Sequence, residues 1–199
     1  LRNITNPDMG ADEFTPVMTD VGMYAFNSPK MPFSPGTNNI IVTIKNHGAE
    51  TINNVAIDWS VNNAMQTRKN WTGTLISGST IQVDMGNYNF NPGTSYDIKS
   101  WTTSPNGHID LNNSNDTIHA TNLYTALAGT YSTGGTNPNF LNLSAAINAL
   151  IQGGISGNVI FKIRNGTYDE QLSIPEIKGV SESNTITFES ESGDSTVVK

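Results

Sequence analysis

Apolar residues occur at every second position in four separate runs between residues 40 and 98. The alternating residues are Ile40, Val42 and Ile44, then Val55, Ile57, Trp59 and Val61, then Ile81, Val83 and Met85, and finally Tyr96 and Ile98. A period of two gives a β-strand one apolar face, whereas a helix needs apolar residues at three- and four-residue spacing. The stretch 36–116 is therefore predicted to form strands that cover a core on one side and face water on the other.

Turn-forming residues separate these runs. Gly and Asn tolerate positive φ and Pro pre-sets a turn, and the separating groups are Ser34-Pro35-Gly36, Asn46-His47-Gly48, Ser77-Gly78-Ser79, Asn91-Pro92-Gly93 and Pro105-Asn106-Gly107. Residues 20–26 add an earlier strand, in which Val21, Met23 and Ala25 alternate. Short strands at this spacing predict an immunoglobulin-like antiparallel β-sandwich of about seven strands. Trp59 is the expected core anchor, because an indole buries a large apolar area.

Residues 20–121 resemble the bacterial CARDB family, whose immunoglobulin-like modules are associated with cell adhesion. The matching segments are Phe33-Ser34-Pro35-Gly36, Val42-Thr43-Ile44-Lys45-Asn46-His47-Gly48, Ile57-Asp58-Trp59-Ser60-Val61-Asn62 and Asn112-Asn113-Ser114-Asn115-Asp116. The resemblance implies a fold and a cell-surface setting, and it implies no catalysis.

The C-terminal third has a different pattern. Residues 122–136 are predicted to be a linker that forms an ordered hinge, because Leu123, Tyr124, Leu127 and Tyr131 accompany its glycines. A helix is expected over 142–152, with Asn142 as its N-cap and Gly153-Gly154 at its end. Alternating Val159, Phe161 and Ile163 and a further run at 185–190 predict strands.

This order of parts resembles the start of a right-handed parallel β-helix of the pectin-lyase-like kind, in which an amphipathic helix caps the solenoid. The resemblance makes residues 137–199 the cap helix and first coils, and it matches Asp169 and Glu170 only to a structural Tyr-x-Glu. In that family the catalytic residues lie on later coils, so none is transferred to this chain. Residues 1–19 are predicted to be a lead-in, in which 6–14 resembles the closing segment of a preceding β-helix.

Composition narrows the classes of partner. Only 14% of residues are charged and the net charge is −7, which disfavours nucleic acid and anionic membrane surfaces. There is no cysteine, so disulfides and thiolate metal sites are excluded. No apolar run approaches the ~18 residues of a membrane helix. The abundance of Asn, Thr, Ser and Gly is typical of extracellular β-proteins, and the simplest expectation is an internal fragment of a longer surface protein.

Three candidate sites remain. Asp110, Asn112, Ser114 and Asp116 have the alternate-residue oxygens of a Ca²⁺ loop, although Asn115 and Thr121 replace the expected Gly and Glu; the alternative is an Asx-turn loop. Trp101 should face outward, where it either stacks on a glycan or packs on a neighbouring domain. Thr117 lies in an Asp-Thr-apolar sequence that resembles an O-glycosylation acceptor.

No catalytic set is recognisable, and no Gly-x-Ser-x-Gly turn is present. The first hypothesis is therefore a non-catalytic structural or adhesive segment of a repetitive bacterial surface or secreted protein. Its partners would be neighbouring domains or copies of the same repeat, and surface glycans are a further option. The alternatives are an accessory sandwich joined to a polysaccharide-active β-helix, and a carbohydrate-binding module.

Overall fold

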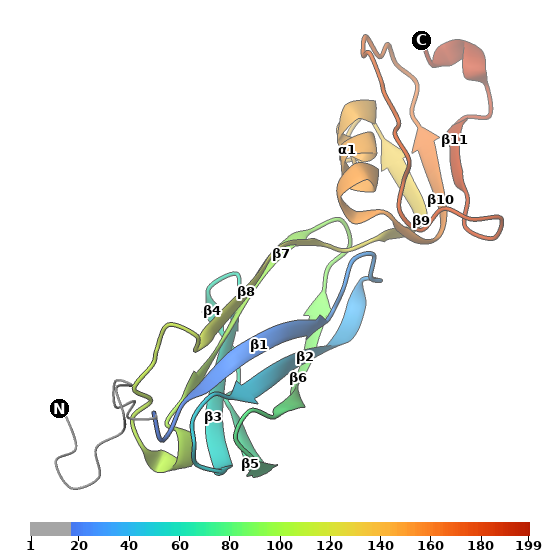
Figure 1. Ribbon diagram of the computed structural model, residues 1–199. Helices are drawn as coiled ribbons and strands as arrows, with labels where there is room; N and C mark the ends of the chain where they lie inside the picture. Colours follow the sequence, from blue (N-terminus) through green and yellow to red (C-terminus); the bar gives the residue numbers. More distant parts are fainter. Residues whose placement is uncertain (1–16) are drawn as a thin grey trace, which may run out of the picture. The chain divides into compact units, whose positions relative to one another are not determined.

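The computed structural model describes residues 17–199, and these residues are mainly β, as predicted (Figure 1). The segment 6–14, predicted to close a preceding β-helix, lies outside the described residues. By its internal contacts the described chain divides into two compact units. The first holds residues 17–26, 42–83 and 98–119, and the second holds 27–41, 84–97 and 120–199. No helix within 17–199 is both long and apolar enough to cross a membrane.

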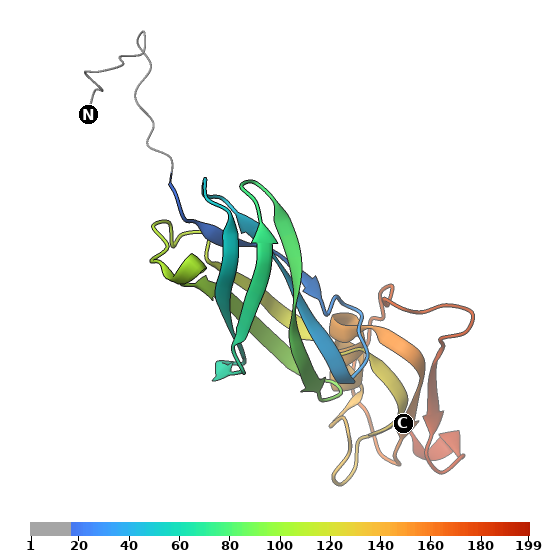
Figure 2. The ribbon, with the colours of Figure 1, turned by 90° about the horizontal axis from the view of Figure 1, so that it is seen from below.

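Two sheets account for the sandwich. One has the order β1-β2-β6, formed by β1 (Val21–Ser28), β2 (Gly36–Asn46) and β6 (Thr80–Phe90). The other has the order β4-β3-β7-β8, with β5 also paired to β3; its strands are β3 (Ile52–Val61), β4 (Ala64–Met65), β5 (Lys69–Leu75), β7 (Ser95–Thr103) and β8 (Thr117–Tyr124). β3 is antiparallel to all three of its partners. In Figures 1 and 2 the strands of both sheets run roughly along one direction.

The predicted apolar faces form the sandwich core. Ile40, Val42 and Ile44 of β2 are fully buried, and Trp59 of β3 is only 3% exposed. The Trp59 Nε1–H donates to the Thr67 carbonyl oxygen at 2.9 Å, so its polar atom is satisfied. Ile81 departs from the prediction, because it lies at the start of β6 and is 37% exposed.

The opposite face of β3 is more buried than its alternating pattern predicted. Asp58 and Ser60 were expected to face water, yet both are buried. The guanidinium of Arg68, which precedes β5, donates Nε–H and Nη2–H to the two carboxylate oxygens of Asp58, each at 2.7 Å. This bidentate pair covers the carboxylate and explains how a charge is tolerated there.

Four aromatic rings pack together inside the second unit. Phe90 lies 5.1 Å from Phe33 and 4.8 Å from Tyr96 between ring centroids, both edge-on, and Tyr88 contacts Phe90 at 5.0 Å. Within the same unit Thr125 bridges to Phe33, and the Ala126 N–H donates to the Phe33 carbonyl oxygen at 2.8 Å.

A parallel sheet follows in the order β9-β10-β11. Its strands are β9 (Leu127–Thr133), β10 (Ile155–Ile163) and β11 (Ile186–Ser190), and both pairings are parallel. The one α-helix of the described chain, α1 (Leu143–Gly153), lies between β9 and β10 in sequence. Two short 3₁₀ turns, η1 (Pro105–Gly107) and η2 (Ser195–Val197), complete the elements.

Helix α1 has the boundaries that its residues predict. The Asn142 side chain accepts a hydrogen bond from the Ala145 N–H, and Gly154 ends the helix at φ +70°. Ala146 and Leu150 join a buried cluster with residues of the parallel sheet; the other members are Leu127, Ile155, Val159, Phe161 and Ile177. Ile151, which follows Leu150, is 43% exposed.

The segment 122–136, predicted to be a linker, contains a complete strand. Residues 127–133 form β9, whose Gly129, Thr130 and Tyr131 pair in register with Val159, Ile160 and Phe161 of β10. Its glycines and polar residues hid this role, because a strand partner about 30 residues away leaves no local mark in the sequence.

We expect Trp59→Ala to lower the free energy of unfolding by about 3–5 kcal/mol. The substitution leaves a cavity in the core and removes the hydrogen-bond donor of the Thr67 carbonyl oxygen. The control is Trp101→Ala on the opposite face of the same sheet, which should cost about 1 kcal/mol or less. Chemical denaturation followed by circular dichroism measures both. Equal effects of the two substitutions would mean that the faces are assigned wrongly.

Candidate functional site

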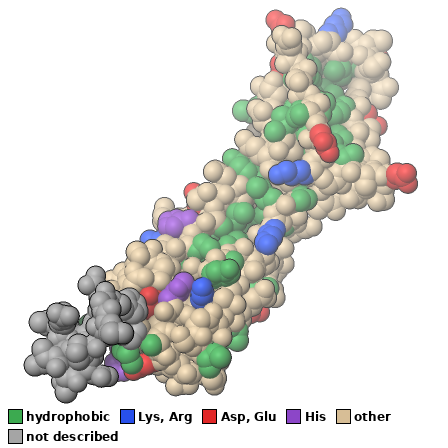
Figure 3. Space-filling view, in the orientation of Figure 1, with side chains coloured by type: hydrophobic (Ala, Val, Ile, Leu, Met, Phe, Trp, Pro, Cys, Tyr) green, Lys and Arg blue, Asp and Glu red, His purple; other side chains and the backbone are tan. Residues whose placement is uncertain are grey.

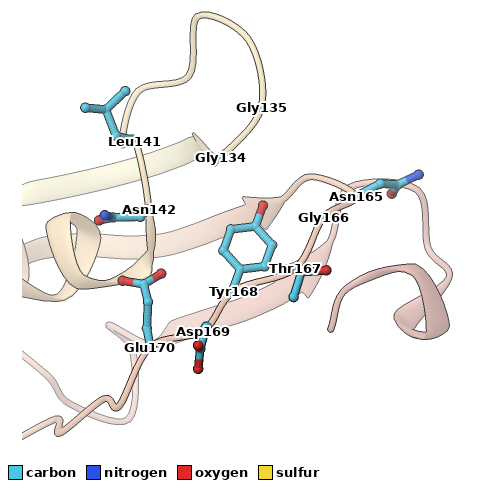
Figure 4. A pocket seen from close by; sticks show the side chains of 10 residues that line it. All are labelled: Gly134, Gly135, Leu141, Asn142, Asn165, Gly166, Thr167, Tyr168, Asp169 and Glu170. Atoms are coloured by element: carbon cyan, nitrogen blue, oxygen red, sulfur yellow. The ribbon is translucent and has the colours of Figure 1, made fainter.

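A group of polar residues borders a surface hollow around the segment after β10. A hollow of about 330 Å³ is lined by Gly134, Gly135, Leu141, Asn142, Asn165, Gly166, Thr167, Tyr168, Asp169 and Glu170. Figure 4 shows the Glu170 carboxylate beside the start of α1, while the Asp169 side chain points away from the Tyr168 hydroxyl. The hollow therefore contains the Tyr-x-Glu segment that the sequence marked as structural.

Glu170 anchors the first turn of α1. Its two carboxylate oxygens accept from the N–H groups of Leu143 and Ser144, at 3.1 and 2.8 Å, and Asn142 takes the N–H of Ala145. These are the amides that an α-helix leaves unpaired at its N-terminus, where a negative charge is also favourable. The hydroxyl and then the N–H of Ser144 lower the pKa of Glu170. A carboxylate held ionised in this way is a weak proton acceptor and a good structural anchor.

Tyr168 joins the loops on the other side of the hollow. Its hydroxyl donates to the carbonyl oxygen of Arg164 at 2.7 Å and lies 3.3 Å from that of Thr133. Gly134 lies against this hydroxyl at φ +77°, and a Cβ there would collide with it. Only glycine suits both the backbone conformation and the close approach. The hollow is thus held by contacts that serve the fold.

A second polar cluster joins the start of β1 to the loop before β8. Asp110, which is buried, accepts from the Val21 N–H at 2.8 Å and from the Asn112 N–H at 3.0 Å. Asp20, also buried, accepts from the side-chain amides of Asn112 and Asn115, at 3.2 and 2.9 Å. Sequence reasoning missed Asp20, because about 90 residues separate it from its partners and local spacing cannot reveal such a pairing.

The predicted Ca²⁺ ligands are engaged with the backbone and with one another. The Asp110-to-Asn112 hydrogen bond is an Asx turn, the alternative weighed for this loop, and the Ser114 hydroxyl donates to Asn112 Oδ1 at 2.6 Å. Asn113, with its amide nitrogen facing them, can donate to the Asp110 carbonyl oxygen and to Asp116 Oδ2. Within residues 17–199 no group of three His, Cys, Asp or Glu side chains is arranged to hold a metal ion. Calcium binding stays a prediction.

Asp116 is the titratable group that this cluster perturbs most clearly. Burial, followed by the negative charge of Asp110, raises its pKa from 3.8 to about 6, while a hydrogen bond with Thr102 opposes the rise and Asp20 adds to it. Its buried Oδ1 has no partner among the described residues, nor does Oδ1 of Asn115. The folded state therefore favours a protonated Asp116 in mildly acidic solution.

Trp101 and Thr117 lie where the sequence placed them. Trp101 is half-buried on the face of β7 opposite the buried Ser100 and Thr102, and the Lys99 ammonium lies 5.1 Å from its ring centroid. Lys99 thus makes a cation–π contact with the side chain that was predicted to meet a glycan or a domain. Thr117 is exposed at the first position of β8. Neither role is tested by this geometry.

Comparisons with known proteins give fold likenesses. No family model matches the sequence, and no curated protein matches it. The crystal structure of the CARDB domain of the PF1109 protein from Pyrococcus furiosus, in complex with di-metal ions, is 18% identical with a TM-score of 0.47, and the match covers 58% of this chain and 100% of that one. A domain of a protein named as a cell surface protein, from Methanosarcina acetivorans, is 20% identical with a TM-score of 0.44, and covers 52% and 90%.

A β-glucuronidase from glycoside hydrolase family 2 is 16% identical with a TM-score of 0.34, and the match covers 55% of this chain and 11% of that one. The CARDB family, which residues 20–121 resemble in sequence, is named for the Pyrococcus furiosus domain among these structures. These TM-scores are below 0.5, so the function proposed for this chain rests on its own residues.

We expect Glu170→Ala to loosen the first turn of α1, because two helix amides lose their acceptor. Hydrogen exchange of the Leu143 and Ser144 amides should accelerate at neutral pH, while the neighbouring substitution Asp169→Ala should leave them unchanged. In the unsubstituted chain this protection should be present above the ordinary pKa of a glutamate and lost as the pH falls through the lowered pKa of Glu170. Unchanged exchange in Glu170→Ala would contradict the anchoring role.

Asp116→Asn should stabilise the protein at pH 7.5 and lose that advantage near pH 4.5. With a raised pKa the folded state binds the proton more tightly than the unfolded state, so the contribution of Asp116 falls as the pH rises from about 4 to about 6. Discounted for solvent screening, the gain at pH 7.5 should be about 1 kcal/mol, or about 2–4 °C in Tm. Thermal melts at both pH values, with Asp169→Asn as control, test this; an equal shift at both would refute it.

Proposed function

We propose that this chain is a non-catalytic structural segment of a bacterial surface or secreted protein, in which sandwich modules alternate with β-helical modules. The observation that carries the proposal is the repeated register of the parallel sheet. Phe161 of β10 pairs with Tyr131 of β9 and with Phe188 of β11, so three aromatic residues occupy one column across three strands.

The geometry of this column is that of a stacked solenoid. The ring centroids of Phe161 and Phe188 are 4.9 Å apart and the rings are stacked, with 19° between their planes; those of Tyr131 and Phe161 are 6.0 Å apart, with 32° between the planes. The paired positions 129, 159 and 186 follow at intervals of about 30 residues. Strands that return in register after one such interval, with aromatic side chains in one column, support the first rungs of a parallel β-helix.

The exposed end of this sheet supports continuation by a further rung. β11 is paired on one edge only among the described strands, and its Ile186 and Phe188 are less buried than Val159 and Phe161 of β10. Leu172, Ile174 and Val180 are also exposed. An uncovered apolar column beside an unpaired edge favours addition of another parallel strand, and we propose that the next coil of the same protein supplies it.

The surface chemistry supports an extracellular setting with other modules or copies as partners. Charged side chains are sparse on the face seen in Figure 3, where most of the surface is uncharged and polar. The chain has 10 basic and 17 acidic residues and no cysteine. This balance offers little attraction for nucleic acid.

Antibodies raised against residues 17–199 should label intact, unpermeabilised source cells or their secreted material, because the proposed protein is exposed at the surface. Antibodies to a known cytoplasmic protein of the same cells are the control. Labelling that appears only after permeabilisation would overturn the surface assignment. Separately, release of reducing ends from a polysaccharide by the purified chain, abolished by Asp169→Asn, would favour the enzyme alternative.

A further inference from the structure

A second hollow lies on the outer face of the five-stranded sheet, and none of the residues that line it was predicted from the sequence to form a site. It measures about 280 Å³ and is lined by Asn54, Val55, Ala56, Asn70, Trp71, Thr72, Ser104 and Gly107. All eight residues belong to the first compact unit. The hollow is therefore formed by β3, β5 and the η1 turn within one unit.

Uncharged hydrogen-bonding groups surround this hollow. Strand register places Asn54 opposite Thr72 and Asn70 opposite Ala56, so two amides and a hydroxyl border the small Ala56 side chain. Asn54, Asn70 and Thr72 are exposed, and within residues 17–199 their side chains make no hydrogen bond. An amide offers donors and acceptors together, and a hydroxyl does the same. These groups are available to a ligand.

The η1 turn is held in a conformation that shapes the hollow. Ser104 has φ 50° and ψ 55°, and Asn106 has φ 50° and ψ 22°, which are uncommon for residues other than glycine. The Asn106 amide holds the turn against β3: Oδ1 accepts from the Asn53 N–H at 2.7 Å, and Nδ2 donates to the Thr51 carbonyl oxygen at 3.0 Å. Ser104 and Gly107 are thereby fixed at the border of the hollow before any ligand arrives.

The uncharged lining of this hollow favours a neutral ligand. None of the eight residues is titratable, so the hollow offers no ion pair to a phosphate, a carboxylate or an amine. The half-buried Ala56 supplies a small apolar surface between the amides, while the side chains of its neighbours Val55 and Trp71 belong to the buried core. A sugar ring presents apolar C–H groups beside hydroxyls that both donate and accept, which is the complement of this lining.

Trp101 extends the same face. On β7, Thr103 pairs with Ala56 and Trp101 pairs with Asp58, so Trp101 lies two residues along the strand from the hollow, about 7 Å away at the backbone. We propose that this face binds a neutral oligosaccharide, with one sugar ring in the hollow and the next ring toward Trp101. This binding activity does not depend on the structural role proposed above.

The test is titration calorimetry of the full chain with neutral disaccharides and tetrasaccharides of glucose, mannose, galactose and N-acetylglucosamine, with tetragalacturonate as the charged comparison. At least one neutral tetrasaccharide should saturate the chain. The double substitution Asn54→Ala and Asn70→Ala should weaken the affinity for that tetrasaccharide about tenfold, because two side chains that hydrogen-bond the ligand are removed. Gln82→Ala, which removes an exposed amide from β6, is the matched control and should bind as the original chain does.

Trp101→Ala should weaken the affinity for the tetrasaccharide and leave the affinity for the corresponding disaccharide unchanged. If Trp101→Ala abolishes binding of both sugars while the double asparagine variant binds them normally, the binding site is at Trp101 and the proposed site in the hollow is wrong. The proposal also fails if no neutral probe binds, or if tetragalacturonate binds as tightly as the best neutral probe. Because Asn54 and Asn70 are exposed, thermal melts of the double variant should match those of the original chain.

Discussion

The antiparallel pairing of β3 on both sides is the constraint on which the sandwich depends. β3 bonds to β7 along one edge and to β4 and β5 along the other, so it is the central strand of its sheet. Its inward face contributes Ile57 and Trp59 to the core, while its outward face holds the buried Asp58 with Arg68. A strand that is paired on both edges and has one apolar face in the core has little freedom to slip in register.

Hydrogen bonds that carboxylates accept from residues distant in sequence hold the loops and the first turn of α1 in place. The start of β1 is tied to the loop before β8 through Asp20 and Asp110, and the first turn of α1 is tied to the segment after β10 through Glu170. In each case a carboxylate accepts from amides that would otherwise lack a partner. Such contacts fix loops without demanding a balanced surface charge.

The candidate sites differ in what holds their residues. Around Tyr168 and Glu170 the polar side chains are bonded to the fold, which leaves that hollow a structural joint. On the outer face of β3 and β5, the side chains of Asn54 and Asn70 are exposed and make no hydrogen bond within the described chain, while Asn106 fixes the turn beside them. Unbonded groups on a fixed frame can bind a ligand without a large ordering cost.

The sequence by itself determined the strands that have alternating apolar residues, where α1 starts and ends, and that Trp59 is buried, because periodicity and capping are local properties. The tertiary structure alone decided which segments meet. Residues 127–133 resemble a linker until β10 pairs with them, and neither the Asp20 cluster nor the hollow at Asn54 has any signal at neighbouring positions. The physical reason is that a periodic pattern specifies an apolar face and leaves open the distant strand or loop that completes it.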